Sequence, residues 1–297
     1  MPWAELSDVR LYYELLGDGE PLLLIPGLGS TCRLWDPIAP ELARRFSLIL
    51  PDNRDVGRSV GRRQPNSLSD FAADLIELLD ELQVERANVV GISLGGVIAQ
   101  QLAVEHPDRV NRLVLISTAH RFGPYLRDIS ALLGRCLYRM PYALFQRTME
   151  LLGTAPAYYD SHIEEVERKI EEMRVVHAPR SAVVRQLRCL AVSEIDRSCY
   201  RIAAPTLVLS GEYDALVPNC YGQRMAGEIP GSEFRVLAGC GHNPVTEDPT
   251  LMLALLNEFL DRPEGLVGSA TNDSLQSLSK RFRDESVVPS YDRLDVR

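Results

Sequence analysis

The most informative stretch of this chain is Ala87-Asn88-Val89-Val90-Gly91-Ile92-Ser93-Leu94-Gly95-Gly96-Val97. Its first part, up to Gly91, predicts a strand, and a helical pattern continues from Val97 to Glu105. Between them, the residues from Gly91 to Gly95 match the pattern G-x-S-x-G, which needs a sharp strand-to-helix turn that exposes the serine hydroxyl. Because a strand precedes the match directly and a helix follows it directly, we interpret Ser93 as a candidate nucleophile.

The segments on either side of this stretch alternate in the same way. Short apolar runs alternate with longer helical patterns, which predicts an α/β fold with a mostly parallel central sheet flanked by helices. Strands are expected at residues 9–15, 21–25, 47–50, 87–91, 113–116, 206–209 and 234–237. Helices are expected at residues 35–43, 69–82, 97–105, 219–228 and 250–260.

The alternation lapses from about residue 120 to residue 198. This segment is largely helical in pattern and is divided by glycine and proline residues. We interpret residues 120–198 as a helical cap inserted into an α/β core formed by residues 1–119 and 199–262. The Ser-rich residues 263–297, with mixed charge and little apolar content, predict a flexible C-terminal tail.

A serine hydroxyl becomes a useful nucleophile only when a base removes its proton and a third group orients that base. His242 is the one histidine in a glycine-flanked loop after a late strand, and it is our candidate base. In this order of elements the acid lies between Ser93 and His242. Asp214 follows a predicted buried strand and is our candidate acid. Glu212 is the competing carboxylate, but it is nearer the strand end and less able to reach the imidazole.

Acyl transfer also needs two backbone N–H groups that point at the oxyanion of the tetrahedral intermediate. One is expected from Leu94, the residue after the candidate nucleophile. The other is expected from Leu28, in the loop Pro26-Gly27-Leu28-Gly29, where the glycines let the backbone approach a substrate. We therefore predict an oxyanion hole made by Leu28 and Leu94.

These segments together resemble the α/β-hydrolase superfamily over residues 9–262. The resemblance is carried by Pro26–Gly29, Asp52–Ser59, Gly91–Gly96, the Asp214 turn and the His242 loop. Within the superfamily the chain looks most like the small-molecule esterases and lactonases related to 3-oxoadipate enol-lactonase, to polyketide methylesterases and to cofactor-free haloperoxidases. The resemblance implies an α/β-hydrolase fold and a Ser-His-Asp catalytic triad.

The chain departs from this family at two positions. The family usually carries His-Gly where this chain has Pro26-Gly27, and it usually carries glycine at the position of Asp55. Neither change removes a backbone N–H donor, so we expect an active enzyme, but no single substrate can be carried over from the family. Haloalkane dehalogenases and epoxide hydrolases of this fold use an aspartate nucleophile, and Ser93 excludes those reactions.

The resemblance implies an enzyme that cleaves a carboxylic ester or lactone of a small, partly hydrophobic molecule, without a metal or other cofactor. Trp35, Met140 and Phe145 are the candidate substrate-binding residues. The same triad could instead hydrolyse a C–C bond, carry out perhydrolysis or transfer an acyl group to another acceptor. Some proteins of this fold act as small-ligand receptors, and the sequence leaves that alternative open.

Charge and composition limit the other roles of the chain. It has 32 Lys and Arg residues against 41 Asp and Glu residues, a net charge of −9, which opposes binding to nucleic acids or anionic membranes. The N-terminus lacks the pattern of a signal peptide and no apolar run is long enough for a membrane span, so we expect a cytoplasmic protein. The six cysteines are widely spread, which predicts neither a metal site nor disulfides.

Two questions on partners remain open at this point. A homo-oligomer is compatible with the sequence, which does not decide the oligomeric state. The run Lys280-Arg281-Phe282-Arg283 in the predicted tail is the one feature in favour of an interaction protein, and short charged runs are usually just solvated.

Overall fold

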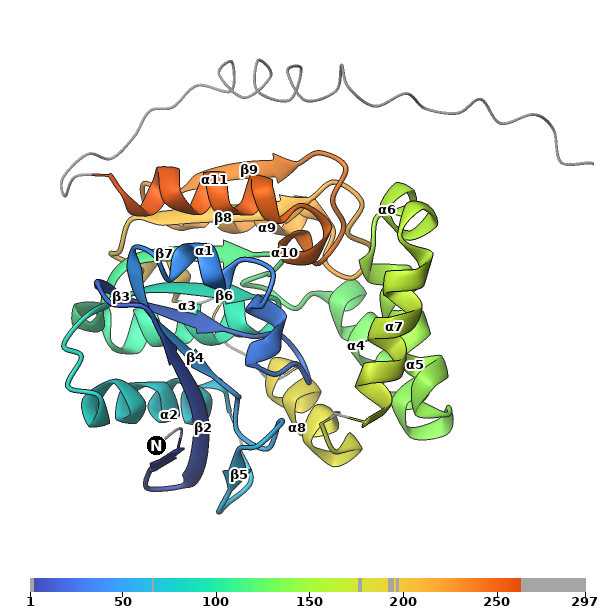
Figure 1. Ribbon diagram of the computed structural model, residues 1–297, viewed down its shortest axis with the longest axis horizontal. Coiled ribbons are helices and arrows are strands. Elements are labelled where there is room, and N and C mark those ends of the chain that lie inside the picture. The colour runs from blue at the N-terminus through green and yellow to red at the C-terminus, as the bar shows by residue number, and fades with distance from the viewer. Residues whose placement is uncertain (1–2, 66, 176–177, 192–194, 196–197, 263–297) are drawn as a thin grey trace, which may run out of the picture. The chain divides into compact units, whose positions relative to one another are not determined.

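The computed structural model describes residues 3–65, 67–175, 178–191, 195 and 198–262 (Figure 1). The predicted tail, residues 263–297, lies outside the described residues. Within the described residues, none of the helices combines the length and the apolar character that a membrane crossing requires.

The core of the fold is one sheet whose strands follow the order β1-β2-β4-β3-β6-β7-β8-β9, with β5 paired to β2. The strands from β4 to β9 along this order run parallel, and β2 runs antiparallel to its neighbours. This confirms the predicted α/β class. The strand bounds are β1 Trp3–Glu5, β2 Val9–Leu16, β3 Glu20–Ile25, β4 Phe46–Pro51, β5 Val60–Gly61, β6 Ala87–Ile92, β7 Val110–Ile116, β8 Thr206–Gly211 and β9 Glu233–Leu237.

Helices cover both faces of the sheet, which explains the continuous apolar runs of its central strands. Along β3, Leu22 and Leu24 belong to one buried cluster, while Leu23 and Ile25 belong to the other. The first cluster contains side chains of α1 and α11, and the second contains side chains of α2, α3 and α9. The bounds are α1 Ala39–Leu42, α2 Leu68–Glu81, α3 Leu94–Glu105, α9 Asn219–Glu228, α10 Pro244–Glu247 and α11 Pro249–Leu260, with short 3-10 turns at η1 Cys32–Trp35, η2 Pro107–Arg109 and η4 Cys199–Arg201.

The helix expected at residues 35–43 is wrong. The chain forms the 3-10 turn η1 and then the single turn α1. Pro37 lies between them and has no backbone N–H to donate, so one continuous helix cannot form there. The strands β1 and β5 were also not predicted, because three and two residues are too short to show an alternating pattern.

Among the described residues, five α-helices lie between β7 and β8. They are α4 Pro124–Arg139, α5 Tyr142–Gly153, α6 Pro156–Ser161, α7 Ile163–Val175 and α8 Arg180–Ala191, and Figure 1 shows α4 to α7 gathered beside the sheet. A third buried cluster joins cap side chains such as Leu133 and Phe145 to Val56 and Leu216 of the core. The cap therefore shares an apolar interface with the core, and the cavity described next lies along it.

Candidate active site

Ser93 lies at the turn between β6 and α3 with φ 56° and ψ −119°, a backbone conformation that residues other than glycine rarely adopt. Its N–H donates to the Ile116 carbonyl at 2.9 Å, and its own carbonyl accepts from the Thr118 hydroxyl at 2.8 Å. A Cβ at Gly91 would lie 2.3 Å from the carbonyl oxygen of Gly95. The glycines of the motif are thus required by close backbone packing, and the turn around Ser93 is held by hydrogen bonds.

His242 follows β9 and meets the carboxylate of Asp214, which follows β8. The Nδ1 atom of His242 lies 2.7 Å from Oδ2 of Asp214. The other oxygen of Asp214 accepts from the N–H groups of Leu216 and Val217 at 2.9 and 2.8 Å, which fixes this buried carboxylate. Glu212 instead accepts from the Gly239 N–H at 2.9 Å. Asp214 is therefore the carboxylate that contacts the imidazole.

Two opposing effects set the pKa of His242. Burial disfavours the charged imidazolium and acts to lower the pKa, but the negative charge and hydrogen bond of Asp214 outweigh it. The carboxylates of Glu247 and Glu150 act in the same direction as Asp214. As a result the pKa of His242 lies above its ordinary value, so this imidazole is a stronger base than a free histidine.

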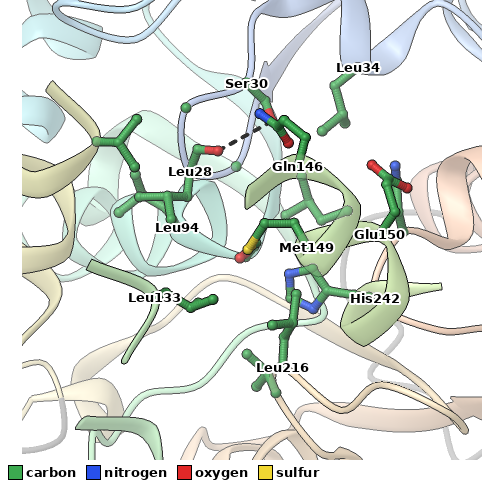
Figure 2. Close-up of a pocket in the computed structure, with 18 of the residues that line it drawn as sticks. Leu28, Ser30, Leu34, Leu94, Leu133, Gln146, Met149, Glu150, Leu216 and His242 are labelled. Carbon is green, nitrogen blue, oxygen red and sulfur yellow. Dashed lines mark hydrogen bonds between the residues drawn. The ribbon is translucent and has the colours of Figure 1, made fainter. Parts of the chain in front are cut away.

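Ser93 and His242 line the same cavity of about 540 Å³ between core and cap. Figure 2 shows His242 on its wall, together with Leu28 and Leu94. Within the described residues, no hydrogen bond joins the Ser93 hydroxyl to the His242 ring. In unliganded sites such contacts are often long and tighten when a substrate binds. The arrangement therefore holds a serine and an oriented base in one chamber, and proton transfer requires the two to approach.

The predicted oxyanion donors lie on the wall of this cavity. Leu94 is the first residue of α3, so its N–H has no partner within the helix, and Leu28 lies in the loop after β3. Two buried side chains hold this loop, and neither was predicted from the sequence. The Asn53 amide donates to the Pro26 carbonyl at 3.0 Å, and Gln186 of α8 accepts from the Gly29 N–H at 2.9 Å.

Of the three candidate substrate-binding residues, the structure places one on the wall of the cavity and two away from it. Phe145 lines the cavity, whereas Trp35 and Met140 are not among the described residues around it. Trp35 is fully buried in the cluster that packs α1 and α11 against the sheet. The 3-10 turn η1 explains the error for Trp35, because it directs the neighbouring Leu34 to the cavity instead (Figure 2). Met140 caps the end of α4 and is only half-buried.

The carboxylate of Glu247 holds the loop that carries His242 through backbone hydrogen bonds. This role of Glu247 was not predicted from the sequence. One oxygen of its carboxylate accepts from the N–H groups of Gly241 and Ala155 at 2.7 and 2.9 Å, and the other accepts from Asn243 at 3.1 Å. The N–H of His242 itself donates to the Gly153 carbonyl. Glu247 thus binds the backbone on both sides of the histidine and joins it to the cap.

Residues 20–249 match the sequence family described as alpha/beta hydrolase fold. The chain belongs to the α/β-hydrolase family. Its fold and the order of Ser93, Asp214 and His242 along the chain agree with this membership.

Individual α/β-hydrolases show how broad the similarity is. A putative carbamate hydrolase RutD from Azorhizobium caulinodans is 31% identical over 79% of this chain and 88% of its own length. A thermophilic esterase from Thermogutta terrifontis is 28% identical, with a TM-score of 0.77 over 86% of this chain and 95% of that chain. The enol-lactonase from Burkholderia xenovorans has a TM-score of 0.81 over 88% of this chain and all of its own, at 22% identity, which supports the fold alone. The chain is therefore a hydrolase by family, and the relatives it resembles are named for different substrates.

Proposed function

We propose that this protein is a serine hydrolase that cleaves a carboxylic ester or lactone of a small, partly hydrophobic molecule. The observation that carries the proposal is the convergence of Ser93 and the Asp214-bound His242 on one cavity. The esterase among its structural relatives supports the same bond class.

In the proposed reaction, His242 takes the hydroxyl proton of Ser93 while the serine oxygen attacks the substrate carbonyl. The N–H groups of Leu28 and Leu94 stabilise the resulting oxyanion. His242 then protonates the leaving alcohol and afterwards activates a water molecule, which releases the acid and restores the serine. Asp214 orients the imidazole and stabilises its charged form. These steps need no cofactor.

The walls of the cavity favour a partly apolar acyl group. Leu133 and Met149 of the cap line it, together with Leu216 of the core (Figure 2). Phe145 of the cap adds a further apolar side chain to the wall. The wall also contains polar side chains, among them those of Gln146, Glu150 and Lys169. The Lys169 ammonium lies 3.0 Å from the Glu150 carboxylate, so these two charges are paired. A substrate with an apolar body and a polar end fits such a chamber.

Carbamate hydrolysis is the second candidate, because a relative at 31% identity is named a putative carbamate hydrolase. A carbamate carbonyl can undergo the same attack by serine. Comparison of matched aryl esters and aryl carbamates would separate the two candidates by kcat/KM. Product analysis would distinguish hydrolysis from C–C cleavage, perhydrolysis and acyl transfer, and tight ligand binding without turnover would favour a receptor.

The first test is intact-mass spectrometry after exposure to a fluorophosphonate. We expect one adduct on the wild-type protein, none on Ser93→Ala, and an unchanged adduct on Ser30→Ala, which removes another hydroxyl from the same cavity. Ser93→Ala is also expected to lower ester turnover by roughly 10⁴ to 10⁶. An adduct that persists on Ser93→Ala would show that another group is the nucleophile.

A further inference from the structure

Outside the cavity, the side chains of His120, Cys199 and Glu228 come together from three separate parts of the chain. Nε2 of His120 lies 3.2 Å from Oε2 of Glu228, and Sγ of Cys199 lies 3.6 Å from the same oxygen. One donor atom from each of the three residues lies within 4.8 Å of the other two. Imidazole nitrogen, thiolate sulfur and carboxylate oxygen are together the ligand set typical of zinc.

The spacing of these atoms fits a tetrahedral ion. Zinc binds nitrogen and oxygen at about 2.0–2.2 Å and sulfur at about 2.3 Å, so its ligand atoms lie roughly 3.3–3.6 Å apart in a tetrahedron. Two of the three separations, 3.2 and 3.6 Å, lie close to this range, and the third, between His120 and Cys199, is at most 4.8 Å, so small side-chain rotations would bring the three atoms onto one ion. Calcium and magnesium prefer sites built from oxygen, so a site with imidazole and thiol favours zinc over these ions.

The surroundings give the site both rigidity and access. His120 and Cys199 are buried, at 2% and 0% exposure, so packing fixes two of the three side chains. Glu228 is the last residue of α9, and its side chain is 43% exposed, which leaves a path from solvent. His120 begins the segment 120–198, and Cys199 follows its last residue. The three side chains thus connect both stems of the cap to α9.

We propose that His120, Cys199 and Glu228 bind one Zn²⁺ ion that joins the two stems of the cap to α9. The imidazole binds as the neutral ring and the carboxylate as the anion. The thiol binds as the thiolate and releases one proton to solvent when the ion enters. A water molecule completes the fourth position. No metal site was predicted from the sequence because these ligands stand at positions 120, 199 and 228, far outside any short cysteine motif.

Cobalt tests the thiolate ligand directly, because Co²⁺ replaces Zn²⁺ in such sites and its bond to sulfur gives a near-ultraviolet absorption band. Chelator-treated full-length protein is titrated with Co²⁺ and then with Zn²⁺. We expect one Co²⁺ per chain, a thiolate band, and loss of the band when Zn²⁺ displaces the cobalt. The band should be absent in Cys199→Ser and retained in Cys220→Ser, which alters an exposed cysteine on α9.

A second variant, Glu228→Gln, tests the same site if the buried substitution Cys199→Ser prevents folding. This exposed substitution preserves the shape of the side chain and removes its charge, so we expect normal folding and Zn²⁺ binding weakened by at least about 10-fold. Zn²⁺ should raise the Tm of the wild type and of the exposed control Glu85→Gln by about 5 °C, and that of Glu228→Gln by much less. Failure of the wild type to bind one ion, or binding that is unchanged in Glu228→Gln, would overturn the proposal. The serine labelling experiment is independent of either result.

Discussion

At the scale of single residues, Asp214 determines both the orientation and the basicity of His242. The imidazole is largely buried, with 14% of the side chain exposed, and burial without a partner would favour its neutral form at a lower pKa. The carboxylate at 2.7 Å reverses this effect and raises the pKa of His242 above its ordinary value of about 6.5. His242 is the proposed general base, and a general base must be neutral to accept a proton, so we expect this pKa to set where activity begins on the pH scale.

We therefore expect kcat/KM for an ester to rise with pH and to reach half of its maximum above about pH 6.5. In Asp214→Asn, burial lowers the pKa of His242 without the opposing charge of Asp214. The rise in kcat/KM should therefore move to lower pH, while its maximum falls by up to about 10⁴-fold. Rate profiles from pH 5 to 9 would measure both effects. Glu212→Gln is the control, and a larger loss there than in Asp214→Asn would show that Glu212 is the acid instead.

Glu247 acts at the same scale, although it does not contact the cavity near Ser93. Its carboxylate accepts three backbone N–H groups, two of them on the residues that flank His242. In Glu247→Gln an amide NH₂ must face at least one of these donors, so the loop should shift and the imidazole should lose its alignment. We expect kcat to fall by about 10- to 100-fold with a smaller change in KM.

The pH profile separates this positioning role from a general loss of stability. Removal of the Glu247 charge should also lower the pKa of His242 slightly, because that charge helps to raise it. Glu212→Gln again serves as the matched control for loss of a loop carboxylate. Wild-type kcat and an unshifted profile in a folded Glu247→Gln protein would mean that the loop keeps its geometry without this anchor.

At the scale of the elements, the core was predictable from sequence and the supports of the site were not. Two features of the core can be recognised within a few consecutive residues. Buried strands such as β3, β6 and β8 require runs of apolar residues, and the tight turn at Ser93 requires nearby glycines. Gln186 supports the loop of Gly29 from 157 positions away. A single glutamine on a cap helix does not predict such a contact, because its partner lies far away in the sequence and is brought near only by folding.

This contact between helix α8 and the loop of Leu28, the proposed oxyanion donor, can be tested with Gln186→Ala. The substitution leaves the buried N–H of Gly29 without its acceptor, at a cost of about 1–3 kcal/mol, and frees the loop that holds the Leu28 donor. We expect kcat to fall by roughly 10-fold or more and KM to change less, because the oxyanion forms only during reaction. Steady-state kinetics would measure this, with Gln223→Ala on the exposed side of α9 as the control.

At the scale of the whole molecule, the cavity has walls from both cap and core, so we expect activity to depend on how firmly the cap is attached to the core. Asp55 and Arg185 form one of these attachments, 2.8 Å apart and with less than a fifth of either side chain exposed. Asp55 keeps φ at 64°, a value that favours glycine, and its other oxygen accepts from the Gly61 N–H. Asp55, at the position where the family usually carries glycine, thus has a strained backbone but also forms an ion pair with Arg185 of α8.

A double-mutant cycle with Asp55→Gly and Arg185→Met measures this link. Asp55→Gly relieves the strained backbone but removes the ion pair, so we expect a small net change in the free energy of unfolding, within about 1 kcal/mol. Arg185→Met should destabilise the wild-type protein more than it destabilises the Asp55→Gly variant, because only in the wild type does it leave a partly buried carboxylate without its partner. The coupling free energy from urea unfolding is expected to be about 0.5–2 kcal/mol. Strictly additive effects would mean that the pair contributes nothing to holding the cap, which the apolar interface around Leu133 and Leu216 and the hydrogen bonds of Gln186 and Glu247 then hold without it.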